Sequence, residues 1–163
     1  MFTYYMPTKV FFGKACVAQS GDVLADLGRK ALLVTGRHSA KVNGSQAAVV
    51  EKLDELGISW FLFDEVENNP SVATIRKAAA FASEKGVDFV IGLGGGSPMD
   101  AAKAIALVCT NELDDEHLFT GPYRKPLPIV AVPTTAGTGS EVTKVSVLTN
   151  PKAGAKQSIN TPL

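Results

Sequence analysis

A chain of 163 residues, 45% of them hydrophobic, is long enough to bury one core, which favours a single domain spanning residues 1–163. Its 16 basic residues balance its 16 acidic ones, and no stretch approaches bilayer-spanning length, so we expect neither nucleic acid nor a membrane as partner. Cys16 and Cys109 have no second cysteine at metal or redox spacing and no signal peptide precedes them, which predicts buried, reduced thiols in a cytoplasmic protein.

Short runs rich in β-branched and aromatic residues alternate along the chain with longer stretches of helical period. Strands are predicted at 9–12, 31–35, 60–64, 89–93, 129–132 and 145–149, and helices at 21–27, 46–56, 72–85 and 98–109. Gly28, Gly57 and Gly86 mark the ends of the first three helices. The alternation predicts an α/β fold with a mostly parallel sheet covered by helices on both faces.

The apolar runs and the carboxyl-terminal tail indicate which parts of the chain belong to the core. The runs at 31–35 and 89–93 are apolar throughout, as expected of central strands buried on both faces. The tail from 150 to 163 is polar and has no pattern, and it stops with no element completed. We therefore expect the tail to lead into a further domain that this chain does not include.

A turn of three glycines, Gly94-Gly95-Gly96, follows the strand predicted at 89–93. Ser97, Pro98 and Asp100 then suit the N-cap, first and third positions of a helix. Glycines allow a ligand to approach the backbone closely, and the amides of a helix's first turn favour an anion, so the turn suits a pyrophosphate. The alternative is a glycine turn without a ligand, which is common in α/β domains.

Two familiar phosphate motifs fit this turn badly. A P-loop needs Lys-Ser or Lys-Thr directly after its last glycine, where this chain has Ser97-Pro98. The ordinary dinucleotide fingerprint follows the first strand of its domain and is answered by an acid about twenty residues later. Here the turn follows the fourth strand-like run, and no acid-ended strand comes next.

A second loop of similar design, Pro-Thr-Thr-Ala-Gly-Thr-Gly-Ser-Glu at 133–141, follows the strand predicted at 129–132. Its glycines and hydroxyls precede a short helix, for which Thr138 and Glu141 form a candidate capping box. Taken alone, the loop is explained equally well as turn chemistry. Two such loops at strand carboxyl ends, however, are typical of nucleotide sites in open α/β sheets.

The residues from 94 to 103, Gly-Gly-Gly-Ser-Pro-Met-Asp-Ala-Ala-Lys, and those from 133 to 143 closely resemble the iron-containing (group III) alcohol dehydrogenases. Residues 7–13, residues 68–70 and Lys156 support the resemblance, which covers essentially the whole chain. The first motif is shared more loosely with glycerol dehydrogenases and dehydroquinate synthases, whereas the second is more particular to the iron-containing branch. The resemblance implies a Rossmann-like domain of the dehydroquinate synthase type.

The resemblance also implies a set of cofactor-binding residues. Gly95, Gly96 and Ser97 would hold the pyrophosphate of a nicotinamide dinucleotide, and Lys156 would lie near the nicotinamide ribose. The residues that would line the rest of the cleft are Asn69, Thr134, Thr135 and Thr138. Asp100 is explained equally well as a cofactor residue and as a helix cap.

The turn after the strand at 31–35 bears on the choice between NADP and NAD. An NAD site usually places a carboxylate there to bind the ribose hydroxyls, whereas this chain has Gly36. Relatives with glycine in that place tend to use NADP, and Ser39 and Lys41 offer a hydroxyl and an ammonium group to its 2′-phosphate. NADP is therefore the preferred cofactor. The alternative is that Arg37, His38 and Lys41 form a solvated basic turn.

Catalysis in the resembling family depends on iron or another divalent metal, held by one aspartate and three histidines of a helical carboxyl-terminal domain. This chain has only His38 and His117, and the charged run at 114–117 is typical of a solvated connection. We therefore expect no metal site and no catalytic residue in this chain. It should bind NADP(H) without turning over the primary alcohol or aldehyde that the full-length enzyme would use.

Several alternatives stay open at this stage. One is a free-standing module that senses NADP(H), and another is an enzyme similar to glycerol dehydrogenase or dehydroquinate synthase. The aromatic segment at 2–5 could form a strand, either within the chain or across the interface of a homodimer. The sequence does not single out one alcohol or aldehyde.

Overall fold

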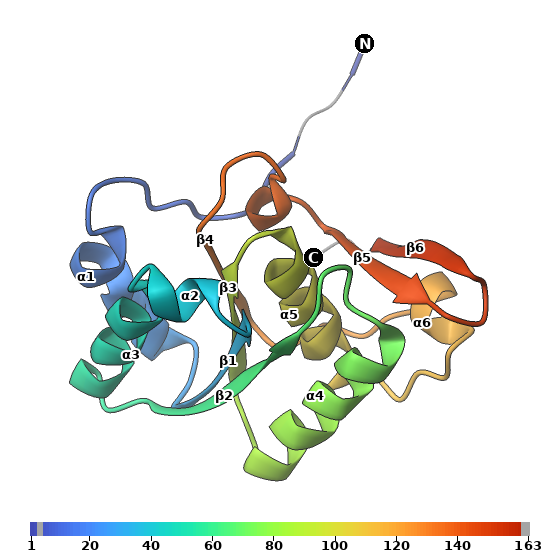
Figure 1. The fold of residues 1–163 in the computed structure, drawn as a ribbon, viewed down its shortest axis with the longest axis horizontal. Coiled ribbons are helices and arrows are strands. Elements are labelled where there is room, and N and C mark those ends of the chain that lie inside the picture. The colour runs from blue at the N-terminus through green and yellow to red at the C-terminus, as the bar shows by residue number, and fades with distance from the viewer. Residues whose placement is uncertain (3–4, 161–163) are drawn as a thin grey trace.

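A four-stranded parallel sheet forms the centre of the computed structural model, which describes residues 1–2 and 5–160 (Figure 1). Its strand order is β2-β1-β3-β4, and every neighbouring pair is parallel. The strands are β1 (Lys30–Gly36), β2 (Ser59–Val66), β3 (Phe89–Gly94) and β4 (Ile129–Pro133). They differ from the predicted runs by no more than two residues at either end, which confirms the α/β prediction.

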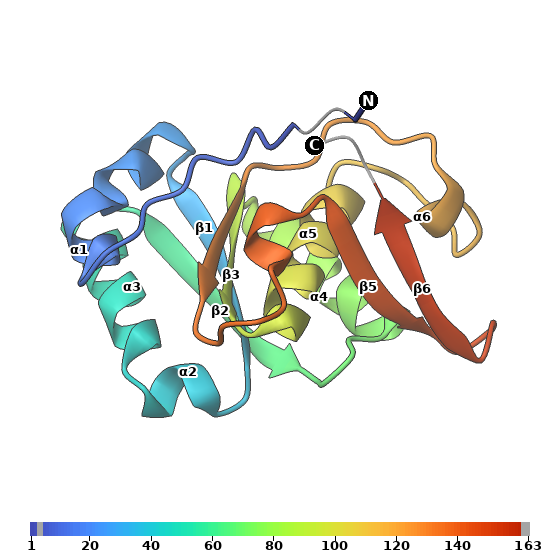
Figure 2. The same ribbon diagram turned by 90° about the horizontal axis from the view of Figure 1, so that it is seen from above.

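Helices cover both faces of this sheet (Figures 1 and 2). On one face lie α1 (Cys16–Ser20), the 3₁₀ helix η1 (Gly21–Asp26), α2 (Ser39–Val42) and α3 (Ser45–Glu55). On the other face lie α4 (Val72–Lys85) and α5 (Gly96–Val108). Because side chains alternate along a strand, Leu33 and Ile91 pack towards α3, while Leu32 and Val90 pack towards α4 and α5. The central strands β1 and β3 are buried on both faces, as predicted.

The two long helices of the second face begin differently. Ser71 caps α4, because its hydroxyl accepts a hydrogen bond from the Thr74 N–H, and Gly86 ends that helix in the left-handed conformation at φ 62°. Helix α5 begins at Gly96 with Gly95 as its N-cap. The predicted cap positions of Ser97, Pro98 and Asp100 are therefore wrong, because the helix starts inside the glycine turn and places all three within its first five residues.

The tail of the chain forms a strand, contrary to the prediction that 150–163 lacks regular structure. β5 (Val145–Asn150) and β6 (Ala155–Asn160) make an antiparallel hairpin beside α5 and the short helix α6 (His117–Thr120) (Figure 2). The residues of β5 are alternately buried and half-buried, and the hairpin adds Leu148 and Ile159 to the core. Too few apolar residues mark β6 for the sequence alone to reveal it.

The amino-terminal region differs most from the prediction. Residues 9–12 form no strand, and Val10 and Phe12 are exposed, since they pair with no strand among the residues described. The helix predicted at 21–27 is the 3₁₀ helix η1, which follows the short α1. The strand considered at 2–5 lies partly outside the described residues. None of the helices described is long and apolar enough to span a bilayer.

Candidate functional site

The loops singled out in the sequence meet at the carboxyl edge of the parallel sheet. Gly36 ends β1, the glycine turn follows β3, the loop from Thr134 to Ser140 follows β4, and Asn69 follows β2. The chain leaves β1 towards β2 on one side, while β3 and β4 lie on the other side. Such a reversal in strand order opens a crevice at the carboxyl ends of the strands, which is where open α/β sheets bind ligands.

The glycine turn is shaped by close packing below it and by open backbone above it. A Cβ atom on Gly92 would lie 2.8 Å from Ala102 Cβ, and one on Gly94 would lie 2.9 Å from Pro98 Cγ. Helix α5 can therefore approach β3 only because these residues are glycines. Gly95 has more room, since its Cβ would lie 3.7 Å from Thr135 Oγ1. The first-turn amides of α5 have no carbonyl within the helix to bond to and are suited to an anion.

The segment from Thr134 to Ser140, called the threonine loop below, lies against the glycine turn. The Thr134 N–H donates to the Gly94 carbonyl at 2.9 Å, and a Cβ atom on Gly96 would lie 3.0 Å from Thr138 Cγ2. Thr135 and Thr138 are exposed. The structure thus brings together the two loops that the sequence assigned to one ligand.

The predicted capping box in this loop does not form. The 3₁₀ helix η2 (Ser140–Val142) begins after Gly139, whose left-handed conformation makes the turn. The hydroxyl of Thr138 accepts a hydrogen bond from the Ser140 N–H at 3.4 Å. Glu141 does not return to the loop, and its Oε2 is buried without a hydrogen-bond partner among the residues described.

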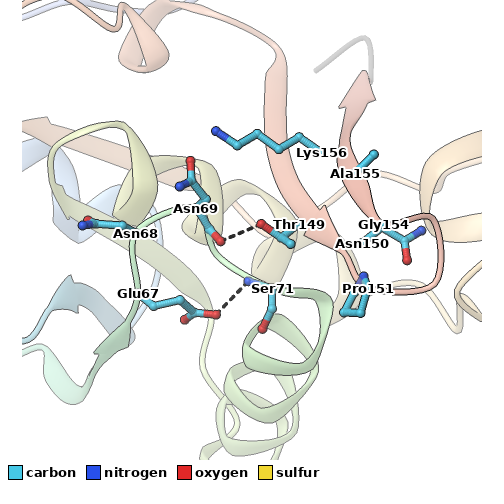
Figure 3. A pocket seen from close by; sticks show the side chains of 10 residues that line it. All are labelled: Glu67, Asn68, Asn69, Ser71, Thr149, Asn150, Pro151, Gly154, Ala155 and Lys156. Atoms are coloured by element: carbon cyan, nitrogen blue, oxygen red, sulfur yellow. Dashed lines mark hydrogen bonds between the residues drawn. The ribbon is translucent and has the colours of Figure 1, made fainter.

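Asn69 ties three parts of the site together. Its backbone is in the left-handed region at φ 57°, and its N–H donates to Ser97 Oγ at 3.2 Å. Its carbonyl accepts a hydrogen bond from Thr149 Oγ1 at 2.9 Å (Figure 3). The end of β2 is thereby joined to the start of α5 and to the hairpin, which the sequence did not connect to the site.

An open hollow of about 570 Å³ lies between Asn69 and the hairpin (Figure 3). Lys156 is paired with Thr149 across the hairpin, and its exposed side chain extends towards Asn69. Below them, burial raises the pKa of Glu67, but hydrogen bonds from the backbone and from Ser71 and Thr74 outweigh it and hold that pKa below its ordinary value. The sequence missed several of the lining residues, Glu67, Asn68, Ser71, Thr149 and Asn150.

At the other end of the crevice, Lys41 is held by an acid that the sequence did not single out. Its Nζ lies 2.6 Å from Asp64 Oδ2, and the hydrogen bond from Lys41 lowers the pKa of Asp64 below its ordinary value. Both side chains are partly exposed, at 46% and 36%. Ser39 begins α2 and is exposed, and Gly36 lies beside Val66 of β2. The turn after β1 thus presents the ammonium group of Lys41 and the hydroxyl of Ser39 near Gly36, which has no side chain.

A buried ion pair lies beneath the threonine loop. Asp100 and Lys103 are one helical turn apart on α5, with Oδ1 and Nζ separated by 3.3 Å and side chains exposed by 15% and 7%. Asp100 accepts hydrogen bonds from Ser140 Oγ at 2.6 Å and from the Val147 N–H at 3.1 Å. Burial lowers the pKa of Lys103, although Asp100 and Glu141 oppose this shift.

The charged run at 114–117 forms ion pairs on the surface. Asp114 Oδ1 contacts His117 Nδ1 at 2.8 Å, and Asp115 binds Arg76 and Lys152. Within residues 1–2 and 5–160, no group of three or more histidine, cysteine, aspartate or glutamate side chains is arranged to hold a metal ion.

These features fit a dinucleotide. The open backbone at Gly95 and the first-turn amides of α5 suit a pyrophosphate, and the crevice runs from a basic turn at Lys41 to a hollow beside Lys156. The fold is an α/β domain of the Rossmann-like type.

Comparison with known proteins gives the family. The family model for iron-containing alcohol dehydrogenase matches residues 7–163, and the chain belongs to this family. An iron-containing alcohol dehydrogenase from Thermotoga maritima is 46% identical, with a TM-score of 0.93 over 98% of this chain and 45% of that one. A sulfoacetaldehyde reductase from Bifidobacterium kashiwanohense, solved in complex with NAD⁺, is 34% identical, with a TM-score of 0.85 over 99% of this chain and 43% of that one.

A curated relative from Bacillus subtilis, described as a probable NADH-dependent butanol dehydrogenase, is 37% identical over 99% of this chain and 42% of its own length. The chain therefore spans less than half the length of the relatives it matches.

Proposed function

We propose that this chain is the nicotinamide dinucleotide-binding domain of an alcohol dehydrogenase that interconverts a primary alcohol and an aldehyde. The observation that carries the proposal is the meeting of the glycine turn and the threonine loop at the carboxyl edge of the sheet. When bound, the nicotinamide accepts or supplies a hydride, and the chain's own residues hold and orient the dinucleotide. The metal that polarises the alcohol oxygen would belong to the longer enzyme.

Each predicted contact residue has a place in this proposal. The backbone at Gly95 and Gly96 and the hydroxyl of Ser97 would hold the pyrophosphate, with Asn69 fixed beside Ser97. The hydroxyls of Thr134, Thr135 and Thr138 would line the cleft next to it, and Lys156 would reach the nicotinamide ribose. Asp100 stays within the proposed site beneath the threonine loop.

We further propose that NADP(H) is preferred over NAD(H). Gly36 offers no carboxylate to repel a 2′-phosphate, and Lys41 with Ser39 offers a cation and a hydroxyl nearby. Lys41 would have to exchange Asp64 for the phosphate, which is a small cost for an exposed ion pair. The description of the Bacillus subtilis relative as NADH-dependent points the other way, so the preference requires a direct measurement.

The test is a titration of the 163-residue chain with NADPH and with NADH, followed by nicotinamide fluorescence. We expect both to bind and NADPH to bind more tightly. Tighter binding of NADH would overturn the NADP preference, and binding of neither would overturn the assignment as a cofactor domain. Separate samples of the chain, supplied with NADP⁺ or NAD⁺, a primary alcohol and a divalent metal, should show no dinucleotide reduction. Measurable reduction would contradict the proposal that this chain alone does not turn over.

A further inference from the structure

Asp100 and Lys103 make hydrogen bonds to the end of the threonine loop and to the segment that follows it. Lys103 Nζ donates to the carbonyl oxygens of Ser140 at 2.8 Å and Val145 at 2.6 Å, and to Thr143 O at 3.3 Å. These acceptors lie at the end of the loop and along the segment that follows it. Lys103 therefore attaches the segment between β4 and β5 to helix α5 through these hydrogen bonds.

Asp100 completes the attachment from one turn earlier on the same helix. One of its carboxylate oxygens accepts from Ser140 Oγ and the other from the Val147 N–H, while its own carbonyl accepts from Ser146 Oγ at 2.7 Å. Both carboxylate oxygens are thus engaged by protein groups. An Asp100 held in this way is poorly placed to accept a hydrogen bond directly from a ligand in the crevice.

The loop end that these residues hold determines where the threonines lie. Ser140 is buried and directly follows Gly139 and Thr138, and the Thr138 methyl group lies against Gly96 at the start of α5. Helix α5 therefore begins in the glycine turn, at Gly96, and one turn later it presents Asp100, which binds the end of the threonine loop. One rigid element sets the distance between the two loops.

We propose that Asp100 and Lys103 are positioning residues, which fix the threonine loop over the glycine turn in the geometry that binds the dinucleotide. The inference rests on the proposed function. It differs from direct recognition by Asp100, because the effect on binding passes through Ser140. Loosening the loop would cost affinity, since the free loop would have to be ordered again on binding.

The experiment compares Asp100→Asn with Asp88→Asn, a matched control. The Asp88 carboxylate likewise accepts two hydrogen bonds, in its case from the Arg29 and Lys30 N–H groups, but it lies at the amino edge of the sheet, opposite the crevice. We expect Asp100→Asn to weaken NADPH binding about tenfold and to speed amide hydrogen exchange in residues 134–142 of the ligand-free chain. Asp88→Asn should change neither.

Ser140→Ala separates positioning from direct contact, because it removes the link to Asp100 and leaves Asp100 in place. We expect it to weaken NADPH binding and to speed exchange in the same segment, with less effect than Asp100→Asn. The inference would be overturned if Asp100→Asn weakened NADPH binding without faster amide exchange in residues 134–142. It would also be overturned if Asp100→Asn and Ser140→Ala both kept the affinity of the wild type. A loss of affinity in Asp88→Asn as large as in Asp100→Asn would also overturn it. A wild-type chain that binds neither NADPH nor NADH overturns the proposed function, and this inference with it.

Discussion

The α5 side and the α2 side of the crevice each contain a lysine paired with an aspartate, but the two pairs differ in burial. On the α5 side, Lys103 is 7% exposed, and its ammonium group contacts three backbone carbonyls as well as Asp100. On the α2 side, Lys41 is 46% exposed and contacts Asp64. Removing one partner of a buried pair leaves the other charge uncompensated, which is costly, whereas an exposed pair can be exchanged for a ligand at little cost.

The same contrast applies to the glycines of the two sides. Gly92 lies under α5 in a space that a methyl group would overfill, while a Cβ atom on Gly36 would lie 3.6 Å from the Val66 carbonyl, an ordinary contact distance. Changes on the α5 side should therefore reduce stability, and changes on the α2 side should alter cofactor choice. The four predictions below test this division.

Lys103→Met should have the largest effect. It leaves the largely buried Asp100 carboxylate without its cationic partner and removes the donor from three carbonyls, so we expect a loss of about 3–5 kcal/mol in the free energy of unfolding. Urea denaturation followed by the fluorescence of Trp60, the single tryptophan, measures it. Lys52→Met is the control: Lys52 is also buried, but its partners Asp22 and Glu55 are exposed and remain solvated. An equal loss of unfolding free energy in Lys103→Met and Lys52→Met would contradict the special role given to the Asp100–Lys103 pair.

Gly92→Ala should have the next largest effect. The new methyl group would lie 2.8 Å from Ala102 Cβ and 3.0 Å from Met99 Cα, so α5 must shift away from β3. We expect a loss of about 1–3 kcal/mol in the free energy of unfolding, measured by the same urea titration. Gly36→Ala, on the α2 side, should leave stability close to that of the wild type. A larger loss in Gly36→Ala would reverse the comparison.

Lys41→Ala should change cofactor choice more than stability. We expect NADPH affinity to fall about tenfold, because a charge-assisted hydrogen bond to the 2′-phosphate is lost, and NADH affinity to stay the same. The control is Lys77→Ala, which breaks another exposed pair with a residue of β2, Glu65. Equal losses for NADPH and NADH in Lys41→Ala would show that Lys41 does not select the phosphate.

Asp64→Asn should have the smallest effect, visible in acid. Lys41 holds the folded-state pKa of Asp64 below its ordinary value of 3.8, so this contribution is complete above that pH and is lost as pH falls through the lower folded pKa. We expect the variant to lose less than about 1 kcal/mol at neutral pH and to show a shallower decline below pH 3.8. Thermal melts between pH 2 and 7 measure this decline in stability. The prediction would be refuted if stability fell equally steeply with pH in the variant and the wild type.

The sequence predicted the parallel sheet well because hydrophobic patterning determines it. The runs that became β1 and β3 are apolar throughout, and Gly86 ends α4 where the pattern stops. Patterning could not predict β6, whose residues are mostly exposed, because that strand depends on pairing with β5. Patterning also misplaces the start of α5, because Ser97 and Pro98 favour the cap and first positions, whereas the helix begins at Gly96.

The candidate site was predicted in part for the same reason. Glycines and threonines after strands are local signals, so the two main loops were found. Asp64 and Thr149 carry no such signal, because their roles depend on Lys41 and Asn69, which are distant in sequence. For Asp100 the sequence left open a cofactor role and a helix cap, and its hydrogen bonds to Ser140 and Val147 could be known only from the fold.

The contact between Asn69 and Thr149 has a consequence for how the protein is made. The two residues are 80 positions apart, and the hollow beside Lys156 needs both strands of the hairpin. During synthesis, the sheet from β1 to β4 can assemble before the hairpin has emerged from the ribosome. The crevice near Lys156 therefore stays unfinished until the hairpin emerges, and a nascent chain would acquire its glycine turn before the hollow beside Lys156.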